Sequence, residues 1–155
     1  MIDYPLCNRI RSFNDPEMSV NSVLANQIAA LFHSDDHITW AGIYMLNPLT
    51  GDCLLDMFQG LPACMKIAAH KGVIGAAVDS QKPIVVSDVH QFDGHIACDS
   101  RTESEMVIPL KPSNILLGVL DLDSDIPGFF DNIDPETIEE LQDVFTATFD
   151  RYLPL

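Results

Sequence analysis

The sequence predicts a single α+β domain: a mainly antiparallel sheet with N- and C-terminal helices packed on one face. Three observations predict this fold. The 155 residues suit one domain. Apolar residues recur at helical spacing near both ends, and the segments between them are successive β-hairpins. We expect a helical segment over residues 1–34, the sheet core over 38–123 and a C-terminal helix over 134–152. Hairpins pair antiparallel, and a helix with one apolar stripe buries it against a neighbouring layer.

The first long helix is predicted over residues 16–33. Asp15 is a suitable N-cap, and Pro16 and Glu17 suit a first helical turn. The apolar residues that follow at helical spacing are Val20, Val23, Leu24, Ile28, Leu31 and Phe32.

The sheet is predicted from two hairpins and two shorter strands. Segments 38–46 and 53–58 are rich in β-formers and flank the turn residues 47–51. Short strands are expected over 64–69 and 83–87, with a small helix over 72–80 between them. The second hairpin joins 105–111 to 114–123 around Pro112 and Ser113.

The last helix begins with the same signature as the first, Asp134-Pro135-Glu136. Its apolar stripe consists of Ile138, Leu141, Val144, Phe145, Phe149 and Tyr152.

Composition and charge narrow the class of protein. The chain is 47% hydrophobic and 20% charged, which is typical of a globular protein. Its 8 basic and 23 acidic residues give a formal net charge of −15, so its field repels nucleic acid and anionic membrane surfaces. No apolar run approaches the roughly 20 residues that cross a bilayer, and the segment Met1–Tyr4 lacks the features of a signal peptide. We therefore expect a cytoplasmic protein, whose four cysteines are thiols unless a disulfide is catalytic.

Cys98 is the first candidate for chemistry. It lies in a segment, 88–101, that has no sustained periodicity and concentrates His, Asp and Gly. A protonated His90 or His95 would stabilise its thiolate, whereas Asp93 or Asp99 beside the sulfur would oppose it. A buried cysteine that acts as a small apolar residue is the structural alternative.

Cys64 leaves two interpretations open. If it meets Cys98, a sulfenic acid on one sulfur can be captured by the other as a disulfide, but two unrelated thiols fit the 34-residue separation as well. Cys64, His90, His95 and Cys98 could also form a four-ligand zinc site, although their spacing lacks the paired ligands of zinc motifs.

Three acids are expected to converge at one end of the sheet. Asp121 and Asp123 lie two residues apart, on one face of a strand, and Glu105 begins the partner strand. They could be solvated at the strand end, bind a cation, or include a carboxyl whose raised pKa lets it donate a proton. Trp40, the sole tryptophan, fits the core or the wall of an apolar subsite.

At these residues the sequence resembles the free methionine-(R)-sulfoxide reductase family, a branch of the GAF-domain superfamily. The resemblance covers nearly the whole chain through the blocks Trp40–Tyr44, Phe58–Cys64, Gly72–Gly75, Asp88–His90, Gly94–Asp99, Ser104–Glu105 and Leu120–Ser124.

The resemblance implies a GAF-like fold and roles for the candidate residues. Cys98 would be the nucleophile and Cys64 the resolving cysteine. Glu105, Asp121 and Asp123 would hold free methionine sulfoxide or supply a proton, and Trp40 would contact its methyl-sulfur end. It further implies no bound cofactor or metal, thioredoxin as electron donor with NADPH as the ultimate source, and a homodimer.

One position departs from the family pattern, because Ile74 stands where many members carry a third cysteine. Either Cys64 alone resolves Cys98, or Cys53 or Cys7 takes part. A different class of function, a non-catalytic GAF module that senses a small ligand in the same pocket, is the main alternative; a zinc-binding module is the third.

Overall fold

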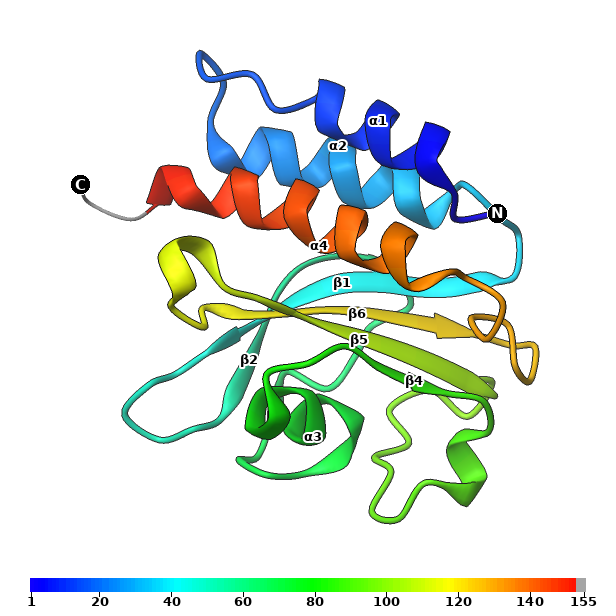
Figure 1. Cartoon of the computed structure of the whole chain (residues 1–155). Helices are drawn as coiled ribbons and strands as arrows, with labels where there is room; N and C mark the ends of the chain where they lie inside the picture. Colours follow the sequence, from blue (N-terminus) through cyan, green and yellow to red (C-terminus); the bar gives the residue numbers. More distant parts are fainter. Residues whose placement is uncertain (153–155) are drawn as a thin grey trace.

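The computed structural model describes residues 1–152, which contain a six-stranded antiparallel sheet in the order β3-β2-β1-β6-β5-β4. The strands are β1 (Ile38–Leu46), β2 (Cys53–Gly60), β3 (Lys66–Ile67), β4 (Ile84–Val86), β5 (Ser104–Leu110) and β6 (Gly118–Ser124). The α-helices are α1 (Tyr4–Ser12), α2 (Val20–Phe32), α3 (Gly72–Ser80) and α4 (Pro135–Phe149). Figure 1 shows α1, α2 and α4 together on one face of the sheet, and α3 with the loop before β5 on the other. The predicted α+β architecture is confirmed.

The alternation of side chains along the central strands divides the interior into two layers. The helix layer contains, from the strands, Ile38, Ala41, Ile43, Met106, Ile108, Leu110, Leu120 and Leu122. The opposite layer, beneath α3, contains Trp40, Tyr44, Val107 and Val119. Residues of odd number on β5 and β6 thus face away from the terminal helices, and this places Glu105, Asp121 and Asp123 on the α3 side.

The predicted start of the N-terminal helix is wrong. Two helices occupy this region, and α2 begins at Val20, where the Ser19 side chain accepts a hydrogen bond from the Ser22 backbone N–H at 3.1 Å. Asp15 instead accepts from the backbone N–H of Glu17 at 2.9 Å. A side chain that accepts a hydrogen bond from the backbone N–H two residues later forms a turn and does not cap a helix. Asp15 therefore forms a turn, and Ser19 caps the helix instead.

Three further boundaries differ. The predicted strand 64–69 contracts to Lys66–Ile67, and the second hairpin's return strand begins at Gly118 rather than 114. Ser113 and Asn114 have φ of 50° and 61°, so the turn extends past Pro112 before pairing resumes. Helix α4 starts as predicted, with Asp134 accepting from the Thr137 N–H at 2.8 Å, but ends at Phe149 in a 3-10 turn, Asp150–Tyr152.

Among the helices of residues 1–152, none combines the length and the apolar character that crossing a membrane requires.

Candidate active site

Strand register builds the floor of the candidate site. On β6, Asp123 pairs with Trp40 of β1 on one side and with Glu105 of β5 on the other. One step along the same face, Asp121 lies between Gly42 and Val107. Directly opposed side chains in an antiparallel pair lie within contact reach. The three predicted acids and Trp40 are therefore brought together by β pairing.

Trp40 lies flat over its neighbours because two glycines leave room for the indole. A Cβ at Gly42 would come within 2.5 Å of the ring, and one at Gly60 within 2.6 Å. The ring stacks on Phe58 at a centroid distance of 5.3 Å, and its Nε1 donates a hydrogen bond to the Leu61 carbonyl at 3.2 Å. The indole is thus fixed in one orientation at the side of the pocket.

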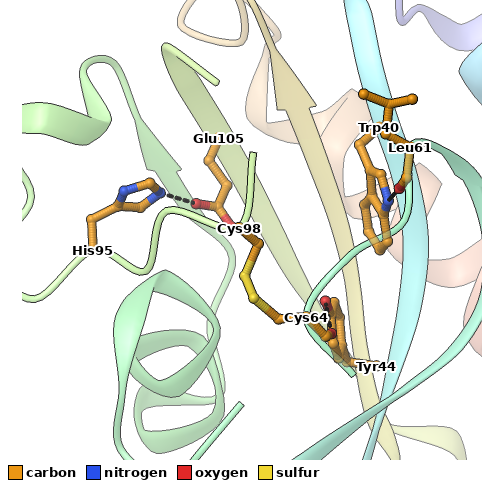
Figure 2. Close-up of a disulfide and its surroundings, with 7 residues drawn as sticks. All are labelled: Trp40, Tyr44, Leu61, Cys64, His95, Cys98 and Glu105. Carbon is orange, nitrogen blue, oxygen red and sulfur yellow. Dashed lines mark hydrogen bonds and ion pairs between the residues drawn. A yellow bond between two sulfur atoms is a disulfide. The ribbon is translucent and has the colours of Figure 1, made fainter. Parts of the chain in front are cut away.

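Cys64 and Cys98 form a disulfide with a Cα–Cα distance of 5.6 Å, shown in Figure 2. Cys64 lies in the loop that follows β2, and its carbonyl accepts a hydrogen bond from the Tyr44 hydroxyl at 2.8 Å. Cys98 lies in the loop between the 3-10 turn Val89–Gln91 and β5. The spacing left contact between these cysteines open, and the fold brings them together.

The other two cysteines are buried free thiols. Cys7 is in the helix layer, on the far side of the sheet. Cys53 is on the α3 side, where burial raises its thiol pKa to about 11. Because thiolate is the reactive form, neither residue is suited to thiol exchange.

A pocket extends from the disulfide to the acids, with an empty volume of about 560 Å³ including its open mouth. The first residues of α3 form the wall opposite the sheet, and a Cβ at Gly72 would lie 3.4 Å from Ile96, so the Cys98 loop rests on the start of α3. The lining residues used below are Trp40, Lys71, Cys98, Glu105, Asp121 and Asp123.

The carboxyl groups on the floor favour their protonated forms. Burial, reinforced by the charge of Asp123, raises the pKa of Glu105 to about 8. Burial and the neighbouring acids raise the pKa values of Asp121 and Asp123 well above their ordinary range. Within residues 1–152, the buried Oδ1 of Asp121 has no hydrogen-bond partner. An unpaired buried acceptor is costly, so this floor favours a ligand that donates protons or carries positive charge.

Two contacts in the Cys98 loop were not foreseen. The Nε2 of His95 lies 3.4 Å from the Oε2 of Glu105, and both side chains are largely buried (Figure 2). Burial lowers the pKa of His95. Asp99, expected to oppose a Cys98 thiolate, is bound by Arg101 at 2.8 Å, and this hydrogen bond lowers its pKa. The position of His95 three residues before Cys98 was the available signal, but its partner lies on a different strand.

The four-ligand zinc set, considered as an alternative, does not assemble in the structure. Cys64 and Cys98 bond to each other, while His90 faces Glu103 at 3.1 Å. Two other groups within residues 1–152 have ligand atoms within 4.8 Å of one another: Glu105, Asp121 and Asp123, and the more exposed Asp88, His90 and Glu103.

Comparison with known proteins identifies the family. No protein-family model matches the chain. The free methionine-R-sulfoxide reductase of Escherichia coli is 42% identical over 125 residues, which cover 81% of this chain and 74% of that protein. The chain belongs to the free methionine-R-sulfoxide reductase family. It is a thiol-dependent oxidoreductase.

Solved structures support the same assignment. The free methionine-R-sulfoxide reductase of Neisseria meningitidis, determined in complex with its substrate, superposes with a TM-score of 0.87 at 33% identity, covering 95% of this chain and 89% of that one. A putative GAF sensor protein from Burkholderia vietnamiensis gives a TM-score of 0.84 at 39% identity, covering 93% of this chain and 90% of that one. The GAF fold of this reductase is confirmed.

Ile74 distinguishes this reductase from the three-cysteine pattern. It lies in the first turn of α3, is buried, and contributes to the pocket lining. An apolar side chain there cannot enter a thiol relay.

Proposed function

We propose that this protein reduces free methionine-(R)-sulfoxide to methionine, with Cys98 as the nucleophile. The observation that carries this proposal is a disulfide at the edge of a pocket whose floor is three acids, two of them buried. A redox-active sulfur and a set of proton-donating or cation-binding groups are thus available to one small ligand.

The pocket has complementary groups for a free amino acid. An α-ammonium group would donate a hydrogen bond to the unpaired Oδ1 of Asp121. Its positive charge would favour ionisation of Asp123, whose pKa is raised in the empty pocket. An α-carboxylate would lie at the start of α3, which lacks a side-chain cap, beside Lys71. Trp40 offers an apolar surface to the methyl-sulfur end. A peptide-bound residue lacks both terminal charges and would be rejected.

The chemistry requires a thiolate and an acid. The Cys98 thiolate attacks the sulfoxide sulfur while Glu105, whose pKa of about 8 keeps it protonated at neutral pH, gives its proton to the sulfoxide oxygen. That oxygen then passes to Cys98 as a sulfenic acid, and methionine leaves. In sum, one thiol and one sulfoxide become one sulfenic acid and one thioether.

Cys64 completes the cycle in this proposal. Its thiol attacks the Cys98 sulfenic acid, which forms the disulfide and releases water. Two electrons and two protons from thioredoxin, ultimately from NADPH, restore both thiols. Because this relay needs a reducing compartment, we place the reductase in the cytoplasm.

The test is an NADPH assay coupled to thioredoxin and its reductase. We expect turnover with the R epimer of free methionine sulfoxide, and none with the S epimer or with a peptide-bound form. Equal rates on all three would refute the specificity. Cys98→Ser should abolish turnover, whereas Cys7→Ala should retain it; a Cys98→Ser protein with wild-type activity would refute the mechanism.

Similarity to the putative sensor from Burkholderia vietnamiensis supports a second candidate, a ligand-binding module without catalysis. Dimedone separates the two, because it traps sulfenic acids. In a Cys64→Ser protein, the reductase predicts substrate-dependent labelling of Cys98. A sensor predicts ligand binding without labelling.

A further inference from the structure

We propose that three exposed apolar side chains around the disulfide form a docking surface for a protein dithiol reductant. These residues are Leu61, Met65 and Ile96, called here the apolar rim. The proposal rests on the proposed function and adds to it the surface through which electrons enter.

The rim is exposed although apolar. The exposed fraction of the residue is 53% for Leu61, 78% for Met65 and 36% for Ile96. Met65 directly follows Cys64, Leu61 precedes it by three residues, and Ile96 precedes Cys98 by two. Leu61 and Ile96 also border the pocket that Cys98 lines. Exposed apolar groups gathered at one place favour association with another protein.

The disulfide itself is only partly accessible, because both cysteines are of intermediate burial. A macromolecular reductant that reaches either sulfur must cover the flanking side chains. Contact with the apolar rim would then compensate the cost of ordering the two surfaces, as apolar contacts at the centre of an interface do.

Charge around the rim differs from that of the rest of the chain. Residues 57–78 contain no Asp or Glu but include Lys66 and Lys71, in a chain of net charge −15. Lys66 directly follows Met65 and is exposed. The segment that carries Leu61 and Met65 therefore contributes basic and no acidic side chains, whereas Asp93 and Asp99 flank Ile96 in the other segment. A neutral or acidic partner meets the least repulsion on the Cys64 side of the disulfide.

The electron transfer balances with such a partner. One partner thiolate attacks a sulfur of the Cys64–Cys98 bond and forms a mixed disulfide, while the other sulfur leaves as thiolate and takes a proton. The partner's second thiolate then displaces the first sulfur. The partner is oxidised by two electrons to its own disulfide, and both cysteines of this chain are reduced.

Met65→Asp tests the surface, since Met65 does not line the pocket. The purified disulfide form is reduced directly by thioredoxin and thioredoxin reductase, and NADPH consumption is followed without any sulfoxide. A parallel reaction uses dithiothreitol. We expect the second-order rate with thioredoxin to fall at least about tenfold, the equivalent of roughly 1.4 kcal/mol, with an unchanged dithiothreitol rate.

Leu49→Asp is the matched control, because Leu49 is 94% exposed in the turn between β1 and β2. It should leave both rates unchanged. Lys66→Glu should slow thioredoxin alone, most strongly at low salt. Equal thioredoxin rates for wild type and Met65→Asp would overturn the docking surface. Absence of sulfoxide turnover by wild type with dithiothreitol would instead refute the proposed function, so the two failures are distinguishable.

Discussion

The two faces of strands β5 and β6 differ sharply in chemistry although they alternate residue by residue. Toward the terminal helices, Met106 and Leu122 are fully buried in apolar contacts. Toward α3, their neighbours Glu105 and Asp121 are also buried and Asp123 is half-buried, but all three are carboxylic acids with raised pKa values. One face therefore stabilises the fold by burial, while the other carries groups whose desolvation opposes folding.

The difference indicates that the α3 face carries functional groups at a cost in folding free energy. Within residues 1–152 these acids do not each have a basic partner, so packing does not explain their position, and such exceptions concentrate at functional sites. Substitutions of adjacent residues on one strand should therefore separate activity from stability, and the first two predictions below test this separation.

The largest effect is expected from the neighbours Glu105 and Met106. Glu105→Gln removes the proposed proton donor, so kcat should fall by about 10² to 10⁴, with a KM that changes less. Met106→Ala should lower the free energy of unfolding by about 2–5 kcal/mol, because it leaves a cavity in the helix layer. Steady-state kinetics and urea unfolding measure both. If folded Glu105→Gln and Met106→Ala proteins lost kcat equally, the assignment of function to one face and stability to the other would be contradicted.

The second prediction concerns the pH dependence of stability. Glu105 has a folded-state pKa of about 8 against an ordinary value of 4.5. Between these values the folded protein binds more protons than the unfolded chain, so its stability falls as pH rises, by up to about 1.4 kcal/mol per pH unit for this group. Asp121 and Asp123 act in the same direction.

Urea unfolding at intervals from pH 5 to 8 measures this slope. Glu105→Gln should flatten it, whereas Met106→Ala should lower the whole curve without changing its slope. A wild-type protein whose stability rises over this range would contradict the buried, protonated acids.

The third prediction tests the orientation of Trp40. Gly42→Ala places a methyl group within 2.5 Å of the indole and of the Phe58 Cβ, so the ring must shift. We expect KM for the sulfoxide to rise about tenfold, with a smaller change in kcat, because loss of a fitted apolar contact is worth roughly 1–3 kcal/mol. Trp40→Phe should produce a similar rise. A Gly42→Ala protein that folds with unchanged KM would exclude Trp40 from the substrate pocket.

The sequence predicted much of this site because its parts follow strand periodicity. Asp121 and Asp123 share a face by their spacing, and Glu105 opens the partner strand, so their convergence required only the hairpin. Both predicted hairpins are present although some of their predicted end residues were wrong. A turn that continues into left-handed residues such as Asn114 shortens a strand without changing its partner.

Sequence periodicity could not predict the long-range contacts between loops. The closure of Cys64 on Cys98 depends on two loops that lie on the α3 side of the sheet, and no local pattern encodes their meeting. The same holds for His95, whose partner Glu105 lies across the loop. Helix α1 was expected only as part of a helical segment, because its apolar stripe consists of Leu6, Cys7 and Ile10 alone.

The smallest predicted effect compares two His–Glu pairs formed by one loop. His90 faces Glu103 at 3.1 Å and is exposed, whereas His95 faces Glu105 at 3.4 Å inside the pocket. An exposed pair contributes at most about 1 kcal/mol, so His90→Phe should leave activity and its pH profile unchanged. His95 is neutral at pH 7 because burial lowers its pKa, and its Nε2–H can still donate to the Glu105 carboxylate.

His95→Phe removes that donor, so the pKa of Glu105 should rise. The alkaline limb of the kcat profile, where Glu105 loses its proton, should then move to higher pH by the same amount. Profiles of kcat between pH 6 and 9 for both variants measure the shift. If His90→Phe moved the limb as far as His95→Phe, the effect would arise from the loop as a whole, and the contact between His95 and Glu105 would have no separate role in holding the proton.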